Sequence, residues 1–436
     1  MKEKCYKRGI SLALSVVLLA GTACSNTKTN TSTAESKRFE FTTTSESISE
    51  GGMENKTEIT SESTREGQTS SISETTTASE EKANPYAIEI PQATVWTKDY
   101  DNEAFNIKGV EEVRTIGLVT GDGSENQTRT RFKVGGTDLG IPVYHKDKLY
   151  LWFGDTFWGD KNGHPMQGGL WRSNVLALSE DKDFSDGLRI ADMLTKGKGN
   201  TATELLSSKK IPGTEHTVIP TGSVSVNGKL YVYFMSVKEW GKPGEWVLNY
   251  GGLAVSEDDG QSFTKIEGFE LDPDRFGQFA AGVVDDYVYG VGIGGGRRGD
   301  AYLARVPLAD IENIDAYSYF TGMDGDEPVF SGNVKEATKI IDRQVGEPSF
   351  MYNDYLQEYV VTYLDEPEHA IVMRTAKELW GPYSDELIIG SSADFPAMYG
   401  GFVHPLMTEE DGKVFYYMMS MWDPVYNSIL MQVRLK

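Results

Sequence analysis

An all-β fold is predicted by two features of this 436-residue chain: a strand motif that recurs five times, and the lack of long helical patterns between its copies. Each copy joins a turn of acidic or small residues to alternating aromatic and aliphatic residues, which is typical of a hairpin with a buried strand. The copies lie roughly 60 to 80 residues apart, the length of one four-stranded sheet with its loops. Repeated sheets of this kind predict a five-bladed β-propeller. The five copies are 146–156, 227–237, 285–296, 353–366 and 411–422.

A second set of segments follows the first in register and predicts the next strand of each blade. These segments are 171–184, 249–263, 301–314, 369–383 and 428–436. Residues 256–263 within this set (SEDDGQSF) resemble the Asp-box hairpin of sialidase-type propellers, in which an Asp caps backbone amides and a Gly takes a positive φ. This turn supports the architecture and carries no chemistry.

The segment 113–120 (VRTIGLVT) is expected to supply the missing outer strand of the last blade, because the chain ends after the third strand of that unit. An N-terminal strand in that place would cover an exposed edge and close the ring. Few helices are expected, with short helical turns at 192–196 and 334–341.

The N-terminal 83 residues are expected to lie outside the folded domain. Residues 1–23 combine basic residues, an apolar stretch and small residues before Cys24, the pattern of a lipoprotein signal peptide; ordinary secretory cleavage near Ala23 is the alternative. Within 25–83, 26 of the 59 residues are Ser or Thr, so the segment 24–83 is predicted to be a disordered linker. The propeller domain is therefore assigned to 84–436, on an extracellular protein anchored to the membrane by a lipid on Cys24.

The composition limits the classes of ligand that the protein is expected to bind. The formal net charge of −23 argues against nucleic acid and anionic lipid as ligands. Cys5 and Cys24 are the only cysteines, so no disulfide is expected in 84–436. We expect a monomer that binds a polysaccharide and needs no cofactor. A bound ion such as calcium in the axial channel is the alternative.

Polar residues on the innermost strands are the candidates for chemistry, because these strands line the propeller axis. The segments 135–143, 219–226, 277–284, 345–350 and 400–406 supply Asp138, Thr221, Gln278, Glu347 and His404. Asp155, in FGDT of the first unit, is expected at the same mouth. Carboxylates that meet in this way suit glycoside hydrolysis, which needs one acid and one base or nucleophile.

Each of these residues also has a structural interpretation. Asp138 and Asp155 both sit in good turn sequences. Glu347 could pair with Arg343, and His404 could be a packed, hydrogen-bonded histidine.

Sugar-binding candidates lie in the loops and at the strand ends. Exposed aromatic planes stack on sugars, and polar groups bind hydroxyls, although core packing uses the same residue types. The candidates are Trp158, Arg172, Asn174, Thr221, Asn249, Tyr250, Arg297 and His404, with Trp171, Trp240, Trp246 and Trp422 as further aromatic residues near the loops. The sequence GGGRRG at 294–299 fits a dinucleotide fingerprint only literally, because no helix is expected after it.

At GTDLGIPV, LYLWFGDTF, WRSNVLALS, IPTGSVSVNGKLYVYFMSV and WVLNYGGLAVSEDDGQSF, the chain resembles a bacterial family catalogued as domain of unknown function 4185, partly assigned to glycoside hydrolase family 183. The resemblance covers roughly 110–436. It implies a five-bladed propeller with endo-D-arabinanase activity and inversion of configuration. It also implies that the catalytic pair is Asp138 and Asp155.

The function predicted from the sequence is an extracellular, endo-acting, inverting glycoside hydrolase on D-arabinan or a related furanose-rich polysaccharide. A non-catalytic glycan-binding lipoprotein and a sialidase-like glycosidase are the alternatives. Asp138 is expected to be the base and Asp155 the acid, with Glu347 as the alternative acid. An inverting pair should lie roughly 6.5–9.5 Å apart, to leave room for water.

Overall fold

The computed structural model describes residues 84, 86–96, 99–197 and 199–436. The predicted signal segment 1–23, Cys24 and the linker 24–83 lie outside these residues, so the inferences about them stay predictions. Across the described residues, no helix combines the length and the apolar character that crossing a bilayer requires.

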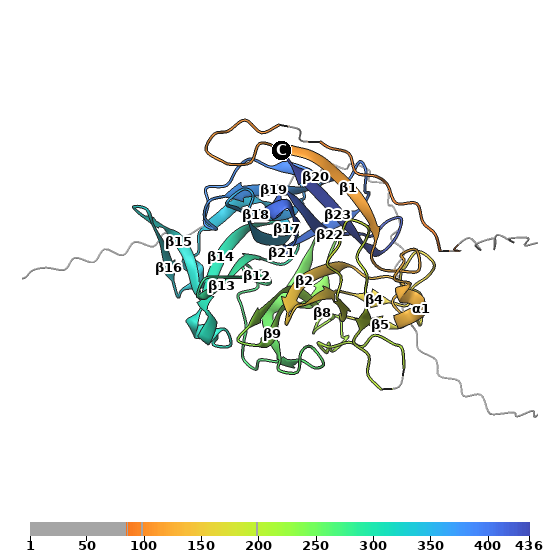
Figure 1. Ribbon diagram of the computed structural model, residues 1–436. Coiled ribbons are helices and arrows are strands. Elements are labelled where there is room, and N and C mark those ends of the chain that lie inside the picture. Colours follow the sequence, from red (N-terminus) through yellow and green to blue (C-terminus); the bar gives the residue numbers. More distant parts are fainter. Residues whose placement is uncertain (1–83, 85, 97–98, 198) are drawn as a thin grey trace, which may run out of the picture. The chain divides into compact units, whose positions relative to one another are not determined.

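The regular secondary structure of the described chain is almost entirely β, in antiparallel sheets that curl side by side (Figure 1). The first sheet contains β2 (Leu139–His145), β3 (Lys148–Phe153), β6 (Val175–Ser179) and β7 (Asp192–Met193), next to the pair β4 (Thr156–Phe157) and β5 (Trp171–Arg172). The second sheet contains β8 (Thr217–Val226), β9 (Lys229–Trp240), β10 (Trp246–Ser256) and β11 (Thr264–Lys265).

The third and fourth sheets are joined at their edges, because β14 pairs with β17. The third contains β12 (Gln278–Val284), β13 (Tyr287–Ile293), β14 (Gly299–Pro307), β15 (Ser318–Asp324) and β16 (Glu327–Ser331). The fourth contains β17 (Lys339–Asn353), β18 (Glu358–Asp365), β19 (Ala370–Ala376) and β20 (Leu387–Ser391). The fifth contains β21 (Met398–Glu409), β22 (Val414–Met421), β23 (Asn427–Leu435) and β1 (Val110–Leu118).

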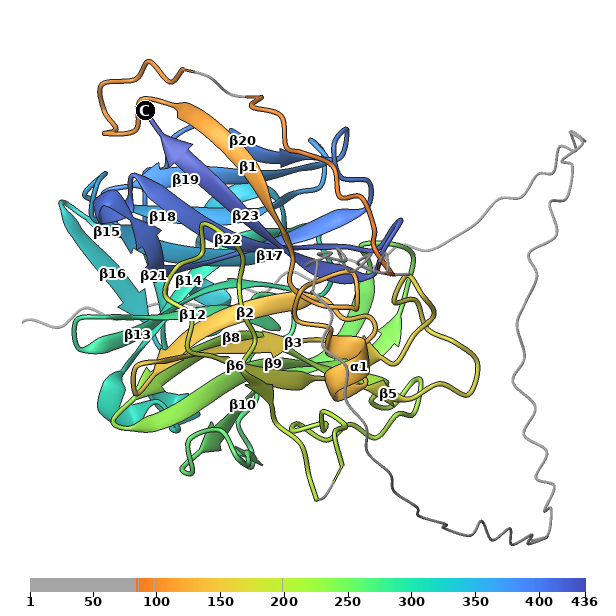
Figure 2. The same ribbon diagram turned by 45° about the vertical axis from the view of Figure 1, so that its right-hand side comes forward.

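Each aromatic repeat coincides with the second strand of a sheet, namely β3, β9, β13, β18 and β22, although β9 extends three residues beyond its repeat. The segment expected to complete the last sheet overlaps β1, which runs antiparallel to β23 from Val110 opposite Leu435 to Leu118 opposite Ile429. Figures 1 and 2 show this pair as the orange strand beside the last blue strand. The outer edge of β23 is therefore covered by a strand from the other end of the described chain.

The first strands of the five sheets are neighbours in space: β2 contacts β8, β8 contacts β12, β12 contacts β17, β17 contacts β21, and β21 contacts β2. Residues at corresponding positions of these strands consequently face a shared interior. This arrangement positions the site described below.

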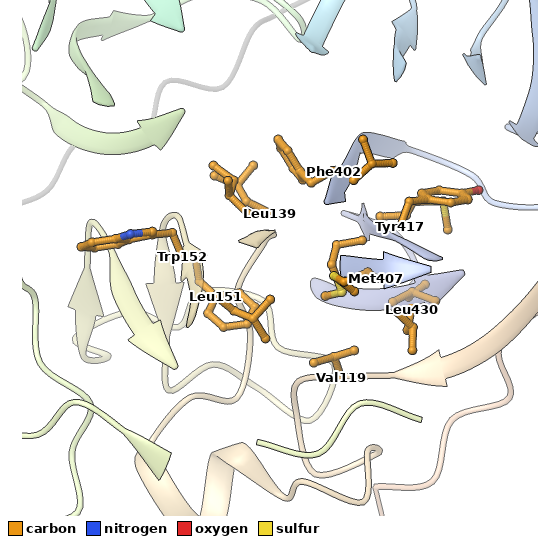
Figure 3. Packing of buried hydrophobic residues seen from close by; sticks show 14 of the residues in the cluster. Val119, Leu139, Leu151, Trp152, Phe402, Met407, Tyr417 and Leu430 are labelled. Atoms are coloured by element: carbon orange, nitrogen blue, oxygen red, sulfur yellow. The ribbon is translucent and has the colours of Figure 1, made fainter. Parts of the chain in front are cut away.

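The largest hydrophobic cluster packs the first sheet against the fifth. Figure 3 shows Leu151 and Trp152 of the first sheet, and Met407, Tyr417 and Leu430 of the fifth, all fully buried. Where β2 passes β22, a Cβ on Gly140 would lie 2.7 Å from the Met418 methyl group, and Gly140 has a φ of 93°. Only glycine fits that close approach without strain.

Helical structure is short. Besides α1 (Thr128–Phe132), the described residues form the 3₁₀ turns η1 (Leu308–Asp310), η2 (Ile314–Ala316), η3 (Val334–Glu336) and η4 (Glu410–Gly412). The turn expected at 334–341 occurs as η3. The one expected at 192–196 is wrong, because Asp192 and Met193 form β7 against Leu178 and Ala177.

The Asp-box-like hairpin has the predicted geometry. Asp258 accepts hydrogen bonds from the backbone amide of Ser262 at 2.9 Å and from its hydroxyl at 2.6 Å. Gly260 has a φ of 85°. The hairpin is a structural turn at the outer end of β10, remote from the cavity described next.

Candidate active site

A cavity of about 840 Å³ opens where the first strands of the sheets begin. Three predicted acidic residues, Asp138, Asp155 and Glu347, lie in its wall with Thr221 and Gln278. Four of the five polar residues chosen from the innermost strands are thus brought together; His404 is not.

Asp138 immediately precedes β2 and is held with little hydrogen bonding. Its Oδ2 accepts a 2.9 Å hydrogen bond from the Tyr399 hydroxyl, while its Oδ1 is buried without a hydrogen-bond partner among the described residues. Burial, followed by the nearby charge of Asp155, raises the pKa of Asp138 to about 7, while the Tyr399 and Tyr426 hydroxyls oppose the rise. The next residue, Leu139, has a φ of 68°, a strained conformation for a branched side chain.

Asp155, between β3 and β4, is better supplied with donors. Its Oδ1 accepts hydrogen bonds of 2.8 Å from both Trp171 Nε1 and Thr217 Oγ1. Burial raises the pKa of Asp155 to about 6, and these two donors limit the rise. Its backbone carbonyl accepts a 2.8 Å hydrogen bond from the Tyr426 hydroxyl, which fixes the loop.

Glu347 projects from β17, where the pairing with β18 is irregular, and its φ is 36°. Its carboxylate oxygens lie 2.7 and 3.0 Å from Arg297 Nε. Burial raises the pKa of Glu347, and the Arg297 charge opposes the rise. The partner expected from the sequence was Arg343, which instead lies 2.9 Å from Asp365.

Tyr399 lies between Asp138 and the Arg297–Glu347 pair. Its hydroxyl donates to Asp138, and the Arg297 guanidinium lies 4.5 Å from the centre of its ring. Arg297 also lies 5.6 Å from the Trp246 ring. One face of the cavity is therefore a connected set of carboxyls, an arginine and aromatic rings.

Tryptophans form much of the remaining wall. Trp171, Trp240, Trp246 and Trp422 all line the cavity. Trp240 and Trp422 are 40% and 45% exposed, which leaves their faces open to a ligand. Trp246 Nε1 is buried without a partner among the described residues, a donor with no acceptor until a ligand supplies one.

Several predicted sugar-binding residues are structural instead. Arg172 is buried and donates to the carbonyls of Ala202 and Lys133 at 3.0 and 2.7 Å. Asn174 is buried, donates to Leu206 and Val218, and accepts from two backbone amides. Neither side chain lines the cavity, and both hold the 202–218 segment against residues 172–174.

Asn249, Tyr250 and Trp158 also lie outside the cavity wall. Asn249 donates to Thr214 and Ser236, and Tyr250 packs edge-on against Phe234. Trp158 is 41% exposed, with the Lys133 ammonium 4.9 Å from its ring centre. Of the eight sugar-binding candidates, the cavity therefore retains Thr221 and Arg297.

His404 lines a second cavity, of about 620 Å³, at the other ends of the same first strands. It packs 4.9 Å from the Tyr144 ring, and its Nδ1 accepts from the Leu406 amide. Burial lowers its pKa to about 4, so it is a neutral, packed histidine. The two cavities share Thr221, Ala280, Pro348 and Phe402 in their walls.

Sequence reasoning missed Tyr399, Tyr426 and Thr217. Tyr399 directly precedes the segment 400–406, and Thr217 precedes 219–226, so both lay at the edge of the inner strands that were searched. Tyr426 gave no local signal, because it arrives from a loop before β23. Among the described residues, no group of three or more His, Cys, Asp or Glu is arranged as a metal site.

The fold and the cavity together define an all-β, propeller-like protein with buried carboxyls at one end of its innermost strands. The chain belongs to the family described as Domain of unknown function (DUF4185), whose model matches residues 123–432. The suspected family is thereby confirmed.

Named relatives were also found. The chain is 28% identical over 330 residues to Notoamide biosynthesis cluster protein J of Aspergillus sp. (strain MF297-2), covering 70% of this chain and 84% of that protein. Its fold is similar, with a TM-score of 0.54 and 12% identity, to a crystal structure from Bacteroides ovatus ATCC 8483 named a "putative hydrolase", over 77% of this chain and 95% of the other. A GH43_1 enzyme from Xanthomonas citri gives a TM-score of 0.42 with 13% identity, over 69% and 87% of the two chains, which is too low for any conclusion.

Proposed function

We propose that this protein is a glycoside hydrolase, endo-acting and inverting, on D-arabinan or a related furanose-rich polysaccharide. One observation carries the proposal: two buried carboxyls, with pKa values raised to about 7 and about 6, share one tryptophan-lined cavity. Glycoside hydrolysis needs one carboxyl protonated and another ionised at the same pH, and unequal environments provide that difference.

The environments favour Asp138 as the acid and Asp155 as the base, the reverse of the assignment expected from the sequence. Asp138 has the higher pKa, so it is the more protonated of the two carboxyls at near-neutral pH. Asp155 accepts two hydrogen bonds, which favour its ionised form. In this scheme Asp155 takes a proton from the attacking water, and Asp138 protonates the departing glycosidic oxygen. The proposed separation of the two carboxyls is roughly 6.5–9.5 Å, the inverting range.

Glu347 fits less well as the acid, because the neighbouring Arg297 charge stabilises its ionised form. We propose that Glu347 instead orients Arg297 through the Arg297 Nε group. The terminal nitrogens of Arg297 make no hydrogen bond to any described residue. Arg297 and Thr221 are the proposed contacts to substrate hydroxyls.

The proposed architecture is a single five-bladed propeller, 84–436, whose ring is closed by β1. It rests on the five successive sheets, the contact of β21 with β2, and the pairing of β1 with β23. Limited proteolysis should then leave a resistant fragment of about 40 kDa that begins near residues 84–110, the weight expected from its length.

The substrate class follows from the charges in the wall. Five carboxylate side chains line the cavity, namely Asp138, Asp155, Glu245, Glu347 and Glu366, against the cations Lys242 and Arg297. A sialoside carries its own carboxylate and would be repelled, and the single arginine is already paired with Glu347. A neutral glycan meets no such penalty.

The test is incubation of the folded domain with D-arabinan, L-arabinan, fructans and sialosides, followed by separation of products and NMR of the first-formed anomer. Short oligosaccharides of inverted configuration from D-arabinan are expected. Binding without product would favour the non-catalytic glycan-binding alternative, and release of sialic acid would favour the sialidase-like one.

We further propose that the mature protein is a monomeric lipoprotein held outside the cell by Cys24. The support is the sequence pattern around that residue. Replacing Cys24 with Ser should abolish incorporation of labelled palmitate and release the protein into the medium. Unchanged membrane retention would place the anchor elsewhere.

A further inference from the structure

Behind Asp155, away from the cavity, a chain of buried side chains leads to a lysine. Thr217 Oγ1 lies 2.8 Å from Asp155 Oδ1 and 2.8 Å from Ser173 Oγ. Ser173 Oγ is in turn in hydrogen-bond contact with Lys210 Nζ. Ser173 and Thr217 are both fully buried, so water does not compete for these contacts.

The Lys210 ammonium fixes one end of this chain of hydrogen bonds. An ammonium can only donate, so Ser173 Oγ accepts from Lys210. Thr217 Oγ1 is placed to donate either to Ser173 Oγ or to Asp155 Oδ1, and its single proton serves one of them at a time. An ionised Asp155 can only accept, so it takes the Thr217 proton, and the positive charge of Lys210 favours that ionised form.

Lys210 also supports the second donor to the same oxygen. Its ammonium lies 3.9 Å from the centre of the Trp171 ring, and Trp171 Nε1 donates to Asp155 Oδ1 at 2.8 Å. A cation over an indole face holds that ring in place. The Lys210 ammonium therefore contacts both groups that lead to Oδ1, the Trp171 ring and the Ser173 hydroxyl. No described residue donates to Oδ2.

The lysine is itself held in position. Lys210 Nζ lies 2.8 Å from Glu204 Oε2, which also accepts a 2.7 Å hydrogen bond from the Ser173 amide. The Lys210 backbone has a φ of 58°, a left-handed conformation that is uncommon for lysine. The 202–218 segment thus places the Lys210 side chain beside Ser173 through a strained backbone conformation.

We propose that Lys210 is a positioning residue for Asp155: it holds the two donors Trp171 and Thr217 at Oδ1, favours the ionised carboxylate, and leaves Oδ2 as the oxygen that meets the reacting water. The inference rests on the proposed hydrolase function for its kinetic consequence. Its effect on the proton affinity of Asp155 does not depend on any substrate.

Other charged or titratable groups around Asp155 act in both directions. Asp138 before β2 and Glu204 oppose its ionisation, whereas Lys210 favours it. His216, packed 5.7 Å from the Trp171 ring, is kept neutral because burial and then Lys210 lower its pKa. Tyr426 contacts the Asp155 backbone and stays protonated, since burial raises its pKa. Lys210 is thus the cation whose removal should change Asp155 most.

The experiment compares Lys210→Met, Lys210→Arg and the exposed neighbour control Lys209→Met. Titration of the Asp155 carboxyl carbon, assigned with Asp155→Asn, should show a pKa about one unit higher in Lys210→Met, the size expected for loss of a nearby opposite charge. Lys210→Arg and Lys209→Met should titrate like the native protein. An unchanged Asp155 pKa in folded Lys210→Met would overturn the inference.

Kinetics provide the second readout. In kcat/KM against pH on the glycan identified above, the limb that reports ionisation of the base should move up by about one unit in Lys210→Met only. If Lys210→Met does not fold, Ser173→Ala decides, because it cuts the chain and keeps the charge: a smaller upward shift of the Asp155 pKa supports the proposal, and none refutes it. A native protein inactive on every glycan would sink the proposed function, while the carboxyl titration would still decide the role of Lys210.

Discussion

The two ends of the five innermost strands differ in how completely their polar groups are satisfied. At the cavity where the strands begin, Asp138 Oδ1 and Trp246 Nε1 are buried without partners among the described residues, and Leu139 and Glu347 have strained backbones. At the second cavity, no lining side chain has a buried unpaired polar atom within the described chain.

At the second cavity, the polar side chains of the same strands are paired with other groups of the protein. Ser223 donates to the Tyr231 carbonyl at 2.5 Å, Ser225 lies 2.8 Å from His145 Nδ1, and Ser349 accepts from the Val403 amide at 3.1 Å. Between these two cavities, only the first has buried unpaired polar atoms in its wall, which is a cost that a ligand site would explain. The comparison therefore favours the first cavity as the site proposed above, and the following experiments test it.

The largest expected effect is on stability, from Glu347→Gln. This change removes the charge opposite Arg297, whose side chain is 18% exposed, and keeps only an amide oxygen as its acceptor, so the free energy of unfolding should fall by about 3 kcal/mol, the low end for a buried ion pair. Ser349→Ala, two residues along β17 and in the other cavity, should cost only about 1 kcal/mol. Urea unfolding measures both, and the double variant Glu347→Gln/Arg297→Met should recover part of the loss. Equal losses at the two positions would contradict the contrast between the cavities.

Asp138→Asn and Asp155→Asn should each lower turnover by at least about a hundredfold, the scale of lost acid–base catalysis, with folding intact. The matched variant His404→Asn, in the second cavity, should retain native turnover. Initial rates on the confirmed glycan measure all three. Near-native turnover in either Asp variant would make that residue a turn aspartate and move Glu347 into its role.

Asp138→Asn should also stabilise the protein, with a defined pH dependence. The folded pKa of Asp138 is about 7, against an ordinary value of 3.8, so ionisation disfavours the folded state. The native protein should lose stability as pH rises from about 4 to about 7, and the variant should escape that loss. A shift from 3.8 to about 7 corresponds to about 4 kcal/mol in full, but solvent in the open cavity screens the charge, so we expect a gain of about 1–2 kcal/mol at pH 8 that vanishes near pH 4. Urea midpoints across this range measure it; a gain independent of pH would show that charge is not its cause.

The smallest expected effect is on KM, from replacement of an exposed tryptophan. Trp422 and Trp158 are 45% and 41% exposed, but only Trp422 lines the first cavity. Trp422→Ala should raise KM by about 3- to 10-fold through lost stacking. Trp158→Ala should leave KM unchanged. The reverse order would place the sugar-binding face outside the cavity.

Repeated local patterns were enough to predict the strands. The aromatic alternation in 146–156 or 411–422 reports burial of that strand's own side chains, whatever the distant chain does. The same applies to Asp138 and Asp155, which stand at the ends of such strands. Turn chemistry was also local, so the Asp258 hairpin followed directly from its sequence.

What the sequence could not provide were partners that meet only in three dimensions. Arg297 rather than Arg343 pairs with Glu347, because β14 approaches β17 at that point. Arg172 and Asn174 resembled sugar ligands, yet their donors are used by carbonyls of the 202–218 segment. Tyr426 reaches Asp155 from 271 residues away.

The pairing of β1 with β23 has a consequence for how the protein is made. Arg114 and Gln432, partners across this pair, are 318 residues apart in sequence, so a ribosome must finish nearly the whole domain before the fifth sheet can form. Until then β1 has no neighbour to pair with, and a nascent chain stalled short of β23 would display an unpaired edge. We therefore expect β1 to be the part of the domain most open to pairing with other chains until synthesis of β23 is complete.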